Sequence, residues 1–127
     1  MGASGASIVQ TLAVVERGDP AAFDFTEADL TMDNAWHDLD VSGIIADANV
    51  KWVLVTMHIA DAAKNKQLHL RKNGNSNEVA VVCIETLASS DPSHQNGWVP
   101  CDGNQVIEYK ATAAISSVDI VVMGWSY

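Results

Sequence analysis

Four histidines, two cysteines and several acidic pairs are the residues of this sequence that could do chemistry. His37, His58, His69 and His94 show neither HxH nor HxxxH spacing, the patterns that let one element hold a zinc ion. No serine lies in a GxSxG elbow, and no GxGxxG or phosphate-binding loop pattern occurs. We therefore expect no catalytic, cofactor or metal site, and a protein that is not an enzyme.

The acidic residues give two weaker candidates. Asp38 and Asp40 lie two apart, hence on one face of an extended strand, where paired carboxylates could do acid–base work or bind calcium. A calcium loop needs a turning backbone, so a solvated strand face is the simpler interpretation. Glu27, Asp29 and Asp33 are better placed because their stretch can turn, although acidic residues on a solvated loop need no ligand to explain them.

Most of the four tryptophans are expected in the core, because one indole buries a large area. Trp98 is the exception, since it follows a polar stretch at residues 88–97 that indicates a long loop. An aromatic ring beside amide groups on a loop is typical of sugar-binding surfaces, and equally of subunit contacts. We therefore assign a ligand or partner contact to Trp98, His94, Gln95 and Asn96.

Composition limits the classes of protein and of partner. The chain has 127 residues, of which 48% are hydrophobic and 18% charged, so it is long enough for one domain with a real core. Its formal net charge is −9, and a surface of that sign repels phosphate backbones and anionic lipid. We expect neither nucleic acid nor membrane as a partner, and no apolar run is long enough to span a bilayer.

The sequence predicts a short leader followed by one domain. Residues 1–7, MGASGAS, are expected to form a flexible leader, and residues 8–127 a single β-sandwich domain. No basic residue precedes the first apolar stretch, which makes it a poor signal peptide. Cys83 and Cys101 flank one loop, and the sequence leaves open whether they form a disulfide or, as we favour, two free thiols.

Residues 51–60, KWVLVTMHIA, alternate with period two and carry bulk on both faces, which predicts a central strand covered on both sides. Other alternating or apolar segments are shorter, and the first of them also fits a short helix. About eight strands with closely spaced turn signals and no long helical pattern indicate an all-β protein, a sandwich or a barrel. The further predicted strands are residues 7–15, 21–25, 35–41, 67–71, 78–85, 98–101, 106–111 and 117–125.

The last of these strands is apolar on both faces, with Val118, Ile120 and Val122 on one of them. One face can pack on the core, but the other needs a cover, and the chain has no long helix to supply it. A neighbouring subunit is the natural cover, so we assign an oligomer contact to Val121, Met123 and Trp125. The residues predicted to form the buried core are Val53, Val55, Leu68, Leu70, Val82 and Ile120.

The order of strand and turn segments resembles the small jelly-roll domains of tailed-phage virions, found in tail fibres, head fibres and capsid-decoration proteins. The segments are WHDLDVS, KWVLVTMHI, LHLRKNG, VIEYKA and VDIVVMGW, within residues 36–127. The resemblance implies a jelly-roll-like antiparallel β-sandwich, located in the virion, that assembles as a homotrimer with other virion proteins or the particle surface. A structural protein of a capsid or fibre is therefore our first expectation, and a glycan-binding module is the alternative.

Overall fold

The computed structural model describes residues 13–127. In that range the chain forms strands and two short 3-10 helices, η2 (Glu27–Asp29) and η3 (Ala88–Ser90), so the all-β prediction is confirmed. The predicted leader, residues 1–7, lies outside the described residues. The strands are β1 (Val14–Glu16), β2 (Phe25–Thr26), β3 (His37–Asp40), β4 (Trp52–Ala60), β5 (Gln67–Lys72), β6 (Val82–Glu85), β7 (Ser93–Pro100), β8 (Val106–Ala111) and β9 (Ser117–Ser126).

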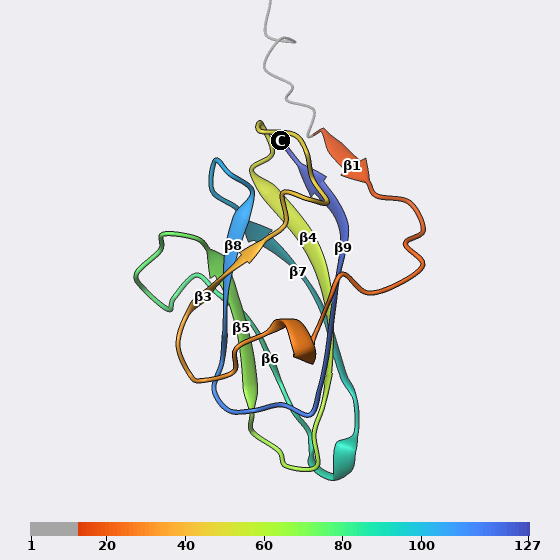
Figure 1. Cartoon of the computed structure of the whole chain (residues 1–127), viewed down its shortest axis with the longest axis vertical. Helices are drawn as coiled ribbons and strands as arrows, with labels where there is room; N and C mark the ends of the chain where they lie inside the picture. Colours follow the sequence, from red (N-terminus) through yellow and green to blue (C-terminus); the bar gives the residue numbers. More distant parts are fainter. Residues whose placement is uncertain (1–12) are drawn as a thin grey trace, which may run out of the picture.

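Two antiparallel sheets pack face to face (Figure 1). One has the order β1-β9-β4-β7, with β2 also paired to β9, and the other has the order β3-β8-β5-β6. The pairs β2–β9, β3–β8, β4–β7 and β5–β6 are nested, as in one long hairpin rolled into two sheets. That is jelly-roll topology, so the predicted jelly-roll-like sandwich is confirmed.

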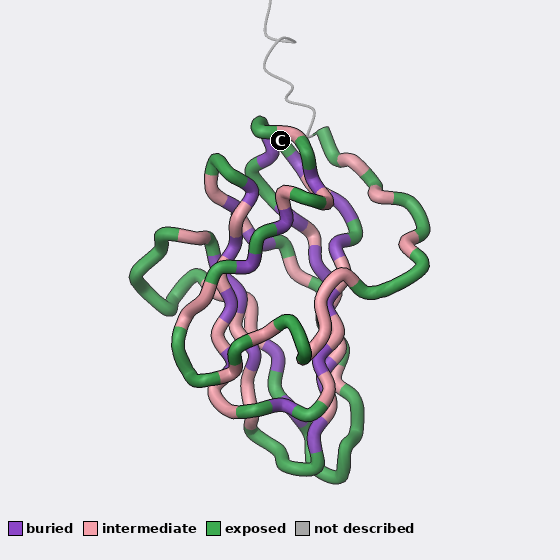
Figure 2. Tube along the Cα trace, viewed as in Figure 1, coloured by how far each residue is buried: buried purple, intermediate pink, exposed green. Residues whose placement is uncertain are grey.

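The core lies between the sheets, and the strongest strand pattern of the sequence supplies its centre. Val53, Val55, Met57 and Ile59 alternate along β4, and each is at most 1% exposed. Figure 2 shows buried segments along the middle of the strands and exposed segments in the loops. Five of the six predicted core residues are fully buried. Val82 is the exception and is only half-buried. It is the first residue of β6, and residues 78–81 before it do not belong to the sheet, although the sequence predicted a strand from residue 78.

The polar stretch before Trp98 is a strand and not the predicted loop. Residues 93–100 form β7, which pairs with β4 over eight register positions. The polar side chains misled the sequence analysis because β7 is an edge strand on which His94, Gln95 and Asn96 all stay exposed to solvent and need not be apolar. Only η3 and the turn after it remain of the expected loop.

A β-bulge changes which side chains of β9 share a face. Leu54 pairs with Gly124, whereas Val55 pairs with Val122, so Met123 is an extra residue on β9. An extra residue moves every later side chain to the opposite face. Val121 and Met123 therefore point outward, but Trp125 packs against the core. The prediction that all three form one surface is wrong for Trp125.

An ion pair secures the loop at residues 17–24 beside this bulge. The Arg17 guanidinium binds the Asp24 carboxylate and also donates to the carbonyl of Val122, at 3.0 Å. The amide of Val122 donates to Asp24 Oδ2 at 2.8 Å. These contacts occupy the edge of β9 between its pairings with β1 and β2, and they hold the loop that carries Phe23 against the sheet.

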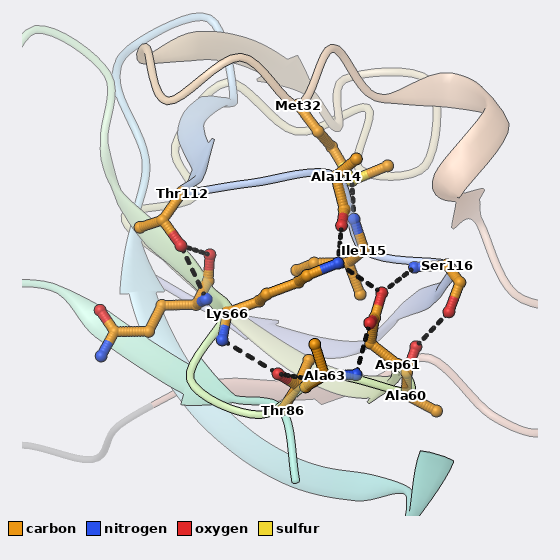
Figure 3. A network of polar contacts seen from close by, with 11 residues as sticks. Met32, Ala60, Asp61, Ala63, Lys66, Thr86, Thr112, Ala114, Ile115 and Ser116 are labelled. Atoms are coloured by element: carbon orange, nitrogen blue, oxygen red, sulfur yellow. Dashed lines mark hydrogen bonds and ion pairs between the residues drawn. The ribbon is translucent and has the colours of Figure 1, made fainter. Parts of the chain in front are cut away.

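A second polar network closes one end of the sandwich (Figure 3). Asp61, 6% exposed, accepts hydrogen bonds from the amides of Ala63 and Ser116 and from Lys66 Nζ, 3.0 Å away. Lys66 Nζ also donates to the carbonyl of Ala114 at 2.7 Å. These hydrogen bonds hold the pKa of Asp61 well below its usual value, and the bond from the Ala63 amide has the largest effect. The network therefore ties the turn after β4 to the β8–β9 connection.

Candidate functional site

The outward side of the five-stranded sheet is the candidate site, and two of its strands carry no charge. β4 and β7 contain no Asp, Glu, Lys or Arg, although the whole chain carries a formal charge of −9. Of the eight large hydrophobic side chains exposed in residues 13–127, five lie on this side. We call it the aromatic face and define it as Val14, Phe23, Trp52, Leu54, Thr56, His58, His94, Asn96, Trp98, Val121 and Met123.

At one end of the aromatic face, two tryptophans flank a shallow hollow. Trp52 on β4 and Trp98 on β7 are 43% and 41% exposed. Val14 and Ser126 complete the lining. The Ser126 hydroxyl donates a hydrogen bond to the carbonyl of the next residue, Tyr127. The hollow therefore offers mainly the surfaces of the two indole rings and few free polar groups.

At the other end, two histidines lie directly opposite each other. His58 and His94 are register partners on β4 and β7, and their rings stack with centroids 4.0 Å apart. Phe23 meets His58 edge-on, with a centroid distance of 5.2 Å. The loop at residues 17–24 thus extends the face beyond the strands.

One contact joins the two sites that the sequence analysis assigned separately. Thr56 Oγ1 lies 2.7 Å from Asn96 Oδ1 on β7 and also contacts Met123 Sδ on β9. Because β4 lies between β9 and β7, the predicted ligand contact and the predicted oligomer contact are halves of one surface.

The structure brings together five of the seven assigned residues. Gln95 pairs with the inward residue Met57, so it points away from the side that carries His94 and Asn96. Trp125 is also removed, by the bulge. The sequence analysis missed Val14, Phe23 and Trp52. All three lie in segments that were predicted as strands, but the prediction that both sides of β4 are covered is wrong on this side. The five assigned residues that share this side are His94, Asn96, Trp98, Val121 and Met123.

The tryptophans are less buried than expected. Trp52 and Trp98 are exposed, and Trp36 and Trp125 are half-buried. Trp36 covers the outward side of the four-stranded sheet, where the Arg71 guanidinium lies 3.8 Å from its ring centre. The prediction that most tryptophans are core residues is therefore wrong.

The cysteines do not form a nucleophilic site. Both thiols are free, with Cys83 half-buried and Cys101 buried, and burial raises the pKa of each. Cys83 Sγ lies 3.9 Å from His69 Nε2, but burial lowers the pKa of that imidazole. A raised thiol pKa and a lowered imidazole pKa favour the neutral pair, whereas a reactive cysteine needs the thiolate.

Within residues 13–127, no group of three His, Cys, Asp or Glu side chains is placed to hold a metal ion. Across the same residues, none of the helices is long and apolar enough to cross a membrane. The sequence matches no family model, and no curated protein matches it.

Proposed function

We propose that this chain is a non-enzymatic structural subunit that associates with further copies of itself through the aromatic face. The proposal extends to a homotrimer in a virion, as a capsid-decoration or fibre protein in contact with other virion proteins. The observation that carries it is a partly apolar sheet face, with no charge on β4 or β7, on a strongly acidic protein.

The exposed side chains on this face are of the kind that form contacts. Trp, Phe and Met are enriched in protein interfaces, whereas charged residues are depleted at their centres. Val14, Phe23, Trp52, Trp98 and Met123 are each at least 40% exposed. A continuous surface of this type marks an interaction site when it is large and framed by polar residues.

Charge favours a second copy of this chain as the occupant. Two subunits of formal charge −9 repel each other, so they can approach closely only through a surface that carries little charge. A basic partner would instead be matched by an acidic surface. The acidic residues of the described strands on this face, Glu16 and Asp119, lie on β1 and β9, and Asp119 is the register partner of His58 on β4.

The virion setting is supported by the jelly-roll topology together with the resemblance of residues 36–127 to small phage jelly-roll domains. Mass spectrometry of purified particles tests it. We expect this chain at a fixed ratio to the main capsid or tail proteins. Particles that lack it, from cells that produce it, would contradict the virion role.

Self-association is tested by light scattering over a range of concentrations. We expect a mass near three times 13.6 kDa at micromolar concentration, and a monomer for the variant Trp98→Ser. Leu87→Ser is the matched control, because Leu87 is 50% exposed and lies outside the aromatic face. A wild-type mass of 13.6 kDa at every concentration would contradict the proposal.

A glycan-binding module is the second candidate, and the hollow between Trp52 and Trp98 is the observation that favours it. Exposed indole rings can stack on sugar rings. A sugar also needs hydrogen-bonding groups, and Asn96 Oδ1 is already engaged by Thr56. Binding on a glycan array that is lost in Trp98→Ala would favour this function over the first.

A further inference from the structure

The stacked histidines lie within the surface that we propose as the subunit contact. The planes of the His58 and His94 rings differ by only 9°, and Phe23 covers an edge of the pair. His94 is exposed and His58 is half-buried, so solvent reaches the pair in an isolated subunit. In an assembled state the same rings would be enclosed.

Few charged groups near the pair could offset the positive charge that the two rings carry when they are protonated. On β9 the register partner of His58 is Asp119, and β4 and β7 carry no other ionisable side chain. The loop that carries Phe23 also holds Asp19, Arg17 and Asp24, of which Arg17 and Asp24 bind each other. Asp91 is exposed on the turn before β7. One carboxylate thus faces two imidazoles across the sheet.

We propose that His58 and His94 form a pH switch for the subunit contact. The contact forms when both rings are neutral and opens when both are protonated. The inference rests on the proposed self-association through the aromatic face, and it adds the regulation of that contact.

Two physical effects act in the same direction. Two positive charges about 4 Å apart repel each other more strongly in an enclosed contact than in water, and Asp119 can balance only one of them. Enclosing a charged ring in an uncharged interface also costs its hydration. Histidine changes charge near pH 6.5, so both effects begin just below neutral pH. Assembly therefore releases protons and is favoured at higher pH.

The test measures the mass and the apparent dissociation constant per subunit at pH 7.5 and pH 5.5. We expect wild-type protein to be assembled at pH 7.5 and monomeric at pH 5.5. Uptake of more than one proton per subunit predicts that the dissociation constant rises more than about tenfold for each pH unit below 6.5. A rise of the dissociation constant of about tenfold or less per pH unit, which corresponds to one proton or less per subunit, would overturn the switch.

The matched variants are H58Q/H94Q and H37Q. The double variant cannot acquire charge at the pair, so we expect it to stay assembled at both pH values. His37 bonds to Asp33, 2.7 Å away, and pairs with Tyr109 in the other sheet, so H37Q should respond to pH like the wild type. If H58Q/H94Q keeps the wild-type response, the switch is wrong.

The same experiment separates the two proposals. Wild-type protein that is assembled at both pH values overturns the switch and leaves self-association intact. Wild-type protein that is monomeric at both pH values overturns both. If H58Q/H94Q does not assemble, the single variant H94Q decides, because it leaves one ring: its response must fall to about tenfold per pH unit or less, and an unchanged response overturns the switch.

Discussion

The outward sides of the two sheets differ in charge and in how far their side chains bind one another. On the four-stranded sheet, Arg71 donates to Glu108 at 2.8 Å and to the carbonyl of Asn77 at 3.0 Å, while Trp36 covers its guanidinium. Lys110 pairs with Glu78. On the five-stranded sheet, Trp52 and Trp98 are 43% and 41% exposed.

The comparison shows that the side chains of one side bind one another, whereas the large rings of the other side stay exposed in the single chain. Arg71 is 6% exposed, and its hydrogen bonds and the indole ring above it come from the same chain. The exposed tryptophans have no comparable contacts within their own chain. Contact between an apolar ring and water is unfavourable, so these rings would be stabilised by burial. The charged side therefore stabilises the fold, whereas the aromatic face is available for a partner.

The largest loss of stability is expected from removing the centre of the charged side. Arg71→Ala leaves Glu108, 14% exposed, without its partner, and breaking such a pair costs about 3 kcal/mol. Urea unfolding measures this loss. Lys72→Ala is the control, because Lys72 is an exposed neighbour, and we expect a change below about 0.5 kcal/mol. Equal losses in the two variants would show that the charged side does not stabilise the fold.

A smaller loss is expected in the core beneath the aromatic face. Val55 is fully buried, so Val55→Ala should lower the free energy of unfolding by about 1–3 kcal/mol through lost burial and a residual cavity. The same unfolding experiment measures it. A loss of only a few tenths of a kcal/mol would remove Val55 from the core.

The pH dependence of stability should come from the bound carboxylates and not from the aromatic face. The pKa of Asp61 is lowered by its hydrogen bonds, so its contribution is present above about pH 4, the unfolded value, and is lost as pH falls below it. Asp61→Asn should therefore lose less stability than the wild type between pH 7 and pH 3 in urea unfolding. Equal losses would show that Asp61 is not perturbed.

The smallest effect on stability is expected on the aromatic face itself. Trp98→Ser removes a side chain that is 41% exposed and should cost no more than about 1 kcal/mol in the isolated subunit, as measured by urea unfolding at high dilution. Together with a loss of association, this result would separate contact from fold. A loss as large as that of Arg71→Ala would place Trp98 among the residues that hold the sandwich together.

The sequence predicted the parts of the fold that depend on alternating apolar residues. Val53 and Val55 on β4 and Leu68 and Leu70 on β5 are buried as expected, because period two fixes their face. It predicted only the end of β7, residues 98–101, since the polar part of an edge strand looks like a loop. It could not place Trp125, because the bulge at Met123 depends on pairing with β4, which the sequence does not display.

The candidate site was predictable only in pieces. His94, Asn96 and Trp98 were assigned as one site and Val121 and Met123 as another, because their adjacency arises from β4 lying between β7 and β9. Phe23 was expected on a strand over residues 21–25, but that prediction is wrong, because the strand begins only at Phe25. It reaches the face through the loop that the Arg17–Asp24 pair holds, and such a contact joins segments about a hundred residues apart in the chain.

Oxidative footprinting of the tryptophans, at concentrations from nanomolar to micromolar, tests the central claim most directly. Each sheet has a tryptophan on its outward side, so one experiment compares both. We predict that Trp52 and Trp98 become protected as the subunit assembles, while the oxidation of Trp36 stays constant. Protection of Trp36 with Trp52 and Trp98 unchanged would place the contact on the charged side and contradict the account.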